Sequence, residues 1–285
     1  MPGLHGAGVA VAGVAERASR RAGIRRPLRA EWIKLRTVRS TAWTLLILVG
    51  ISLLFTTLTC WGSTTTGGSP GHPGDNDIVF DSLSGIWFGA IAAAVFAVLA
   101  ITSEYSSRMI RTSFAADPRR GTLLAAKASI VVSIVFVAGL ATSVASFLIG
   151  QRLLRGGGFV YENGYPAVSL LDGQAFRAVV GGAVYLALLA VFSLSVGAIL
   201  RHTAGAITLV LAVLLAPMIA TNFLPEHLGH RVEESSLLGG GLAVQQTVER
   251  GDSIKLDPWA GLAVGGVYAA ASFLVALVLI RRRDA

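Results

Sequence analysis

The chain has 285 residues, of which 53% are hydrophobic and 14% are charged, and its mean hydropathy is +0.66. This composition excludes an ordinary soluble domain and predicts an all-α integral membrane protein. The single cysteine, Cys60, cannot form an internal disulfide or a cysteine-based metal site. The net charge of +8 is explained by membrane topology, so we expect no nucleic-acid partner.

Residues 1–26 are predicted to be a disordered cytoplasmic tail. Their apolar run, Ala7 to Ala15, is short and is followed by arginines, which is the wrong order for a secretory signal. Residues 27–42 are predicted to form an amphipathic helix in the inner membrane interface, because apolar residues share one face and basic residues lie off that face. The apolar face comprises Leu28, Trp32, Leu35, Val38 and Ala42.

Residues 43–283 are predicted to form a six-span transmembrane domain. Six uncharged segments are each about as long as the roughly 20 residues that a helix needs to cross a bilayer. They lie near Trp43 to Trp61, Leu83 to Ser103, Thr122 to Gly150, Ala178 to Leu200, Thr203 to Leu224 and Trp259 to Ile280. Pro217 is expected to kink the fifth span. The preceding turn, Arg201-His202, makes the fourth and fifth spans a tight hairpin.

The distribution of charge predicts the orientation. With the N-terminus inside, the inner segments hold 18 Lys and Arg against 5 acidic residues, and the outer segments hold 6 against 11. The positive-inside rule therefore favours two cytoplasmic termini.

The spans, counted between their flanks, are predicted to contain no charged residue, which disfavours secondary ion-coupled transport. Their Ser, Thr and Gly residues suit close packing between helices. No P-loop motif occurs in the sequence, so the chain is not expected to hydrolyse ATP, and no catalytic acid–base pair is evident. The outer loop, 225–257, contains EHLGHRVEE, which has the ingredients of a zinc site but not the H-E-x-x-H spacing; a solvated acidic loop is the simpler interpretation.

The segment from Ile101 to Lys127, ITSEYSSRMIRTSFAADPRRGTLLAAK, separates the second and third spans. It is predicted to be a cytoplasmic hairpin, with Asp117 and Pro118 starting the returning helix. Glu104 is expected to contact Arg108, four residues on, or the amphipathic helix. The basic residues could serve a docking surface, or they could only enforce topology beside lipid headgroups.

Two motifs carry a resemblance to a known family. The stretch Ala30 to Trp43, AEWIKLRTVRSTAW, resembles the helix before the first span in permease subunits of type-2 ATP-binding-cassette exporters, especially actinobacterial ones. In Ile101 to Lys127, the pieces EYSS, IRTS, PRRG and AAK resemble that family's loop between spans two and three. Arg108 and Met109 depart from the pattern, since relatives often have glycine and threonine there. The resemblance covers about Pro27 to Arg283.

The resemblance implies a permease subunit in a bacterial plasma membrane, driven by ATP and Mg on a separate ATP-binding subunit, with no cofactor bound by this chain. A second copy or a close relative would complete the path, and loop 104–121 would transmit the ATPase motion. The implied contacts with the ATPase are Glu31, Lys34, Arg36, Glu104, Tyr105, Arg108, Met109, Arg111, Phe114, Asp117, Arg119 and Arg120.

Several alternatives remain open at this stage. A non-transporting membrane scaffold is the second hypothesis and an intramembrane enzyme the third. Uncharged spans fit a drug, a lipid or a peptide as the substrate equally well. In the outer loop, Ser235 to Thr247 could dip back into the membrane, as short helices in this family do, or could form an ordinary structured loop.

Overall fold

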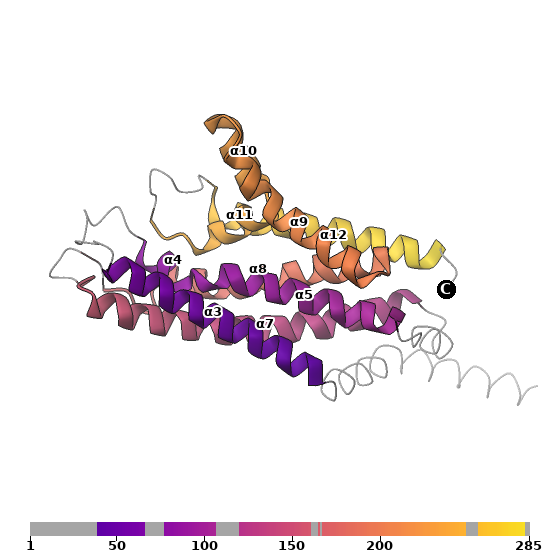
Figure 1. The fold of residues 1–285 in the computed structure, drawn as a ribbon, viewed down its shortest axis with the longest axis horizontal. Helices are drawn as coiled ribbons and strands as arrows, with labels where there is room; N and C mark the ends of the chain where they lie inside the picture. Colours follow the sequence, from indigo (N-terminus) through magenta and orange to yellow (C-terminus); the bar gives the residue numbers. More distant parts are fainter. Residues whose placement is uncertain are drawn as a thin grey trace, which may run out of the picture.

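The computed structural model describes residues 39–65, 77–106, 120–160, 165, 167–248 and 256–282. Over these ranges the chain is helical and contains no strand. The elements in chain order are α3 (Arg39–Thr65), α4 (Ile78–Leu83), α5 (Gly85–Ser106), α7 (Arg120–Gly156), α8 (Gly173–Leu200), α9 (Thr203–Thr221), α10 (Glu226–Ser235), α11 (Leu237–Leu242), the 3-10 helix η2 (Ala243–Gln245) and α12 (Pro258–Arg282) (Figure 1).

Six of these segments are long and apolar enough to cross a membrane: α3, α4 with α5, α7, α8, α9 and α12. Even α9, the shortest of them with 19 residues, reaches about 28 Å at 1.5 Å per residue. That length is close to the roughly 30 Å of a bilayer's hydrocarbon core. Over the described residues, the predicted all-helical architecture with six helices able to span a membrane is therefore confirmed.

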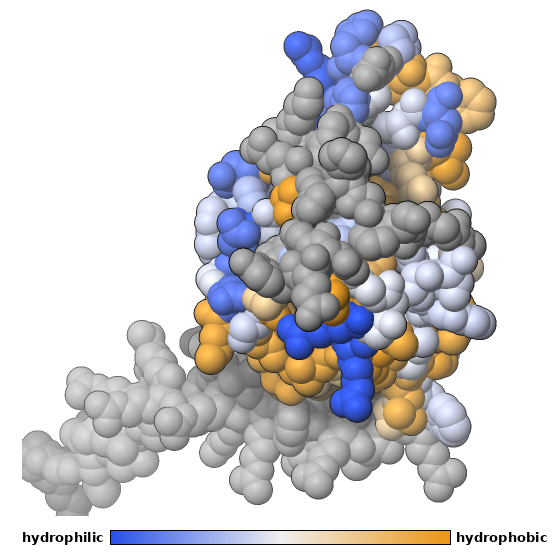
Figure 2. Space-filling model, turned by 90° about the vertical axis from the view of Figure 1, so that its left-hand side faces the viewer, coloured by the Kyte–Doolittle hydropathy of each residue, from blue (hydrophilic) through white to orange (hydrophobic). Residues whose placement is uncertain are grey.

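Consecutive spans run antiparallel, with their long axes roughly aligned (Figure 1). We call the end of the bundle that holds Ser106, Arg120 and Arg201 the inner end, because the sequence predicts that it faces the cytoplasm. The opposite end, with Asp77 and Gly173, is the outer end. Figure 2 looks onto the outer end and shows hydrophilic residues at the top of the molecule, where α10 projects from the bundle.

The helix α8 lies at the centre of the bundle. It packs against α7, α5 and α12, and 72% of its most apolar window is buried. Small residues such as Gly181, Gly182 and Ala183 allow neighbouring helices to approach closely, as is usual inside membranes. The largest buried side chain on this helix is that of Tyr185, which is 0% exposed. The helix α8 is therefore the central element against which α5, α7 and α12 pack.

The helices α3, α9 and α12 lie at the periphery. Only 22%, 17% and 22% of their respective apolar windows are buried. They expose large hydrophobic side chains, including Trp43, Leu54, Ile219, Val267 and Leu274. In a membrane such faces contact lipid tails or another membrane-spanning subunit.

The helix ends differ from the predicted ones in instructive ways. The second span begins at Ile78 rather than Leu83, because Asp77 caps a short helix, α4, and a turn at Ser84 separates it from α5. Residues 39–42 are continuous with the first span, and the rest of the predicted amphipathic helix lies outside the described residues. Pro217 lies inside α9, which continues to Thr221.

The expectation that the spans contain no charged residue is wrong for the helices as they fold. Glu104 belongs to α5 and Lys127 to α7, and both side chains are buried. The reason is that α5 extends past the apolar run that identified it, so that Glu104 lies inside a helix, and that Lys127 lies in the flank of the third predicted span, which the expectation left out. Cys60 is buried in α3, as expected of an inert thiol.

Candidate functional site

A buried ion pair joins two spans at the inner end. The Lys127 ammonium donates a hydrogen bond to Glu104 Oε1 across 2.9 Å, and the two side chains are only 3% and 7% exposed. Glu104 lies in the last turn of α5, and Lys127 lies in the second turn of α7. Charges removed from water must be paired to be tolerated, so this contact fixes the two helices against each other.

A second contact at the inner end links α5 to the turn between α8 and α9. The Arg201 guanidinium lies over the Tyr105 ring, 5.5 Å from its centroid, which is cation–π geometry. Arg201 ends α8 in a left-handed conformation, with φ of 54°, and its N–H donates to the Gly197 carbonyl. The next helix starts at once, because His202 Nδ1 accepts the Gly205 N–H at 3.1 Å.

These two contacts surround both flanks of the predicted coupling loop. Residue 106, two residues after Glu104, ends α5, and residue 120, seven residues before Lys127, begins α7; the connecting residues 107–119 lie outside the described residues. A force applied to that connection would reach α5, α7 and the α8–α9 turn together.

Of the predicted ATPase contacts, Glu104 and Tyr105 lie together in this inner-end cluster. Arg120 is the first residue of α7, and its side chain is not described. The remaining nine predicted contacts lie outside the described residues; they are Glu31, Lys34, Arg36, Arg108, Met109, Arg111, Phe114, Asp117 and Arg119.

The sequence interpretation missed Lys127 and Arg201 as partners of Glu104 and Tyr105. A signal for Lys127 was present, since a single lysine between Leu123 and Ile130, in an otherwise apolar run, needs a counter-ion when that run is buried. The sequence offered no comparable signal for Arg201, because a stacking contact with Tyr105 depends on how the α8–α9 turn is placed.

The outer end contains a segment that packs back into the bundle. Helix α11 and η2 lie among α8, α9 and α12, and Leu237, Leu242 and Val244 are buried. Gly241 lies against the Tyr185 ring, where a Cβ atom would overlap the ring. Tyr185 is about 18 Å along α8 from its outer terminus, Gly173. The segment therefore dips below the outer ends of the spans, which favours the dipping interpretation over an ordinary surface loop.

One carboxylate holds the far end of this segment. Asp77 is 0% exposed and accepts hydrogen bonds from the Val79 and Phe80 N–H groups at 3.1 and 3.0 Å, which caps α4. It also accepts the Thr247 hydroxyl at 2.7 Å, the Thr247 N–H, and the Val248 N–H at 3.0 Å. Five donors thus satisfy one buried carboxylate and join residues about 170 positions apart in the chain.

A second outer contact supports the same segment from α8. The Arg177 guanidinium donates a hydrogen bond to the Gln246 carbonyl at 2.6 Å. At the other end of the segment, Ser236 caps α11 by accepting the Gly239 N–H at 2.9 Å. The dipping segment is therefore fixed at both ends.

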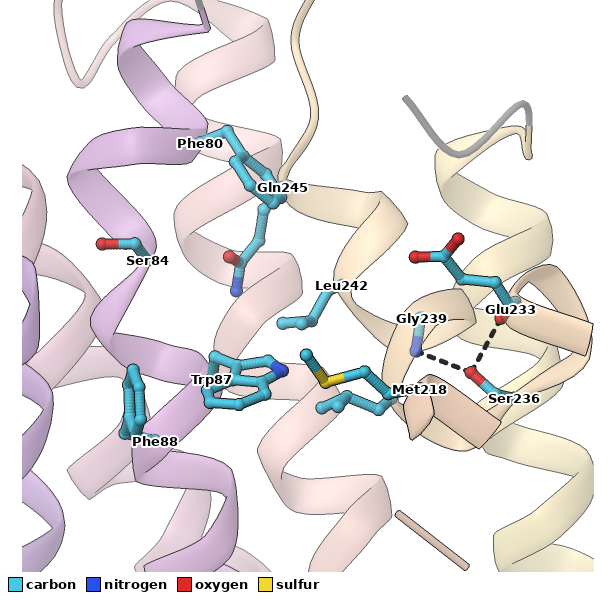
Figure 3. Close-up of a pocket in the computed structure, with 11 residues that line it drawn as sticks. Phe80, Ser84, Trp87, Phe88, Met218, Glu233, Ser236, Gly239, Leu242 and Gln245 are labelled. Atoms are coloured by element: carbon cyan, nitrogen blue, oxygen red, sulfur yellow. Dashed lines mark hydrogen bonds between the residues drawn. The ribbon is translucent and has the colours of Figure 1, made fainter. Parts of the chain in front are cut away.

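A cavity of about 370 Å³ lies beneath this segment at the outer end (Figure 3). Its walls come from α4, α5, α9, α10, α11 and η2. The lining residues are Phe80, Ser84, Trp87, Phe88, Met218, Glu233, Ser236, Leu238, Gly239, Leu242 and Gln245. Its volume and mostly apolar lining are those of a small-molecule site.

Among the described residues, which include His227 and His230, no group of three or more His, Cys, Asp or Glu side chains could hold a metal ion. A scan against models of known protein families and a search of curated proteins gave no match to the chain.

Proposed function

We propose that this chain is the membrane-spanning permease subunit of an ATP-binding-cassette exporter, powered by a separate ATP-hydrolysing subunit. The proposal rests on the resemblance of residues 30–43 and 101–127 to that family, and it agrees with a chain that has six candidate spans. A second copy or a close relative would supply the other half of the translocation path. The proposed location is the bacterial plasma membrane with both termini in the cytoplasm.

The structural observation that supports the proposal is the buried ion pair between Glu104 and Lys127 at 2.9 Å. A coupling loop must be attached rigidly to the helices that it moves. Here the helices on either side of residues 107–119 are joined by a paired charge at their inner ends. Movement of the loop by an ATPase would then displace α5 and α7 as one unit rather than bend either helix alone.

The same helices reach the outer end. Trp87, which lines the outer cavity, lies on the same continuous helix as Glu104, about 26 Å away along its axis. The helix α9, which contributes Met218 to the cavity, starts at the turn that Arg201 ties to Tyr105. Displacement at the inner end would therefore change the relative positions of α5 and α9 around the cavity, which is what alternating access requires.

Buried charges also occur in carriers that use ion gradients. An ion-coupled carrier is therefore the alternative to an ATP-driven permease. Glu104 and Lys127 neutralise each other and lie near helix ends, rather than in the middle of a span. That arrangement suits a structural joint better than a site that releases and takes up protons. A carrier of this kind would work without an ATPase, and the experiment below distinguishes the two.

The test begins with the tagged chain, purified from its native membrane after mild crosslinking, with its partners identified by mass spectrometry. We expect an ATPase with a P-loop. ATP hydrolysis by the reconstituted complex is then compared between the natural chain and the variants Phe114→Ala and Arg111→Glu, which should insert normally but lose stimulated hydrolysis. Arg152→Glu, an exposed charge at the other end of α7, is the matched control and should keep it. Absence of a P-loop partner, or full stimulated hydrolysis in both loop variants, would refute the proposal.

A further inference from the structure

We infer that the outer cavity binds an amphiphilic organic cation, with an apolar body among the aromatic side chains and a positively charged group facing Glu233. The ligand's role as a transport substrate rests on the proposed function, whereas its binding does not.

The wall formed by the second span is aromatic. Phe80, Trp87 and Phe88 line the cavity from α4 and the start of α5. Phe88 is held in place by stacking on Phe55 of α3, with 12° between the ring planes, and its edge contact with Trp87 orients the indole. Preorganised aromatic faces bind flat or bulky apolar groups, and they also attract cations through their negative ring faces.

The opposite wall is aliphatic and comes from the dipping segment and α9. Leu238 and Leu242 are 4% and 8% exposed, so they are fixed in the packing of α11, while Met218 is 50% exposed at the end of α9. Figure 3 shows Met218 lying between Trp87 and the α11 side of the cavity. A flexible methionine facing rigid aromatics allows a cavity to adjust to ligands of different shape.

Among the described residues that line the cavity, Glu233 carries the only carboxylate. Figure 3 shows its carboxylate on the α10 side of the cavity, beside the α11 ribbon. The side chain makes no ion pair with any residue that the structure describes. The part of the lining that the structure describes contains no Lys, Arg or His, so a cation is attracted while an anion of the same shape is repelled.

The position of the cavity fits this class of ligand. It lies near the outer end, where the polar helix α10 meets the apolar ends of α5 and α9. An amphiphilic cation in a bilayer places its charge near the headgroups and its apolar body in the hydrocarbon, so it presents the two parts in the order in which Glu233 and the aromatic wall lie.

The test uses two probes of nearly identical shape and opposite charge, tetraphenylphosphonium and tetraphenylborate. Binding of each to the purified chain, without any ATPase, is measured by equilibrium dialysis in the same detergent. Glu233→Gln removes the charge at constant shape, and Glu234→Gln, the adjacent acid outside the lining, is the matched control. We expect Glu233→Gln to weaken phosphonium binding about tenfold and to leave borate binding equal or stronger, while Glu234→Gln changes neither.

A second variant, Trp87→Ala, tests the aromatic wall independently of Glu233. Trp87→Ala removes the largest aromatic surface and should also weaken phosphonium binding, without changing the preference for positive charge. Equal effects of Glu233→Gln and Glu234→Gln, or phosphonium binding unaffected by both Glu233→Gln and Trp87→Ala, would overturn the inference. Because no ATPase is present, failure here leaves the permease proposal standing, and a chain that binds phosphonium but has no ATPase partner refutes only the latter.

Discussion

Replacing Lys127 by methionine is expected to destabilise the bundle strongly, although methionine has similar length and is apolar. The substitution leaves the Glu104 carboxylate, which is 7% exposed, without its ammonium partner at 2.9 Å. Removing one member of a buried pair typically costs about 3–5 kcal/mol, because the remaining charge stays desolvated. We expect a loss of this size in the free energy of unfolding.

The double variant Glu104→Met with Lys127→Met separates this cause from simple loss of packing. Replacing both charges by apolar groups removes the desolvation cost along with the attraction, so the double variant should lie within about 1 kcal/mol of the natural chain or exceed it in stability. The free energies would be measured by equilibrium unfolding in mixed micelles of increasing denaturing detergent, followed by circular dichroism. Arg152→Met, an exposed charge on the same helix, should change the value by less than about 0.5 kcal/mol.

The cycle of single and double variants gives the interaction free energy of the pair directly. A double variant whose loss equals the sum of the two single losses would show that the side chains do not interact. The assignment of this contact as the joint between α5 and α7 would then be refuted.

Two further predictions concern topology and the dipping segment. In a cysteine-free background, an impermeant maleimide added to intact cells should label Leu171→Cys at the outer end and not His202→Cys in the α8–α9 turn; labelling of His202→Cys alone would reverse the orientation. Gly241→Val should displace α11 from the Tyr185 ring and raise hydrogen exchange of the α11 amides, whereas Gly266→Val, whose added Cβ has open space, should not; equal exchange in both variants would contradict the close packing described for Gly241.

The apolar runs were sufficient to predict the six spans and their order, because hydrophobic length is a local property of the sequence. They were insufficient to predict the residues at which the spans begin and end. Asp77 starts the second span by capping α4, but its carboxylate also needs Thr247 and Val248, which are about 170 residues away. A capping residue whose other partners are distant cannot be recognised from its neighbours alone.

In the candidate sites, too, local features could be predicted from the sequence, and contacts between distant residues could not. Glu104 and Tyr105, predicted from a motif as ATPase contacts, lie in the last turn of α5, and their contact with an ATPase stays a prediction. Their partners could not be predicted, since pairing with Lys127 and Arg201 depends on the way α5 faces α7 and α8. The outer cavity left no local signal, because its walls come from two spans, α4 with α5 and α9, and from the helices α10, α11 and η2, which lie far from α5 in the chain.

The central position of α8 has a consequence for biosynthesis. Membrane-spanning segments are made and inserted in sequence order, so α3, α5 and α7 enter the bilayer before the helix on which α5 and α7 pack has been translated. The ion pair between Glu104 and Lys127 can form within this early three-span intermediate, because both residues precede α8. It would hold α5 and α7 in their final register until α8 arrives. A ribosome stalled before residue 173 would therefore leave a partly ordered product, with two charges already protected from lipid, instead of three independent helices open to membrane proteases.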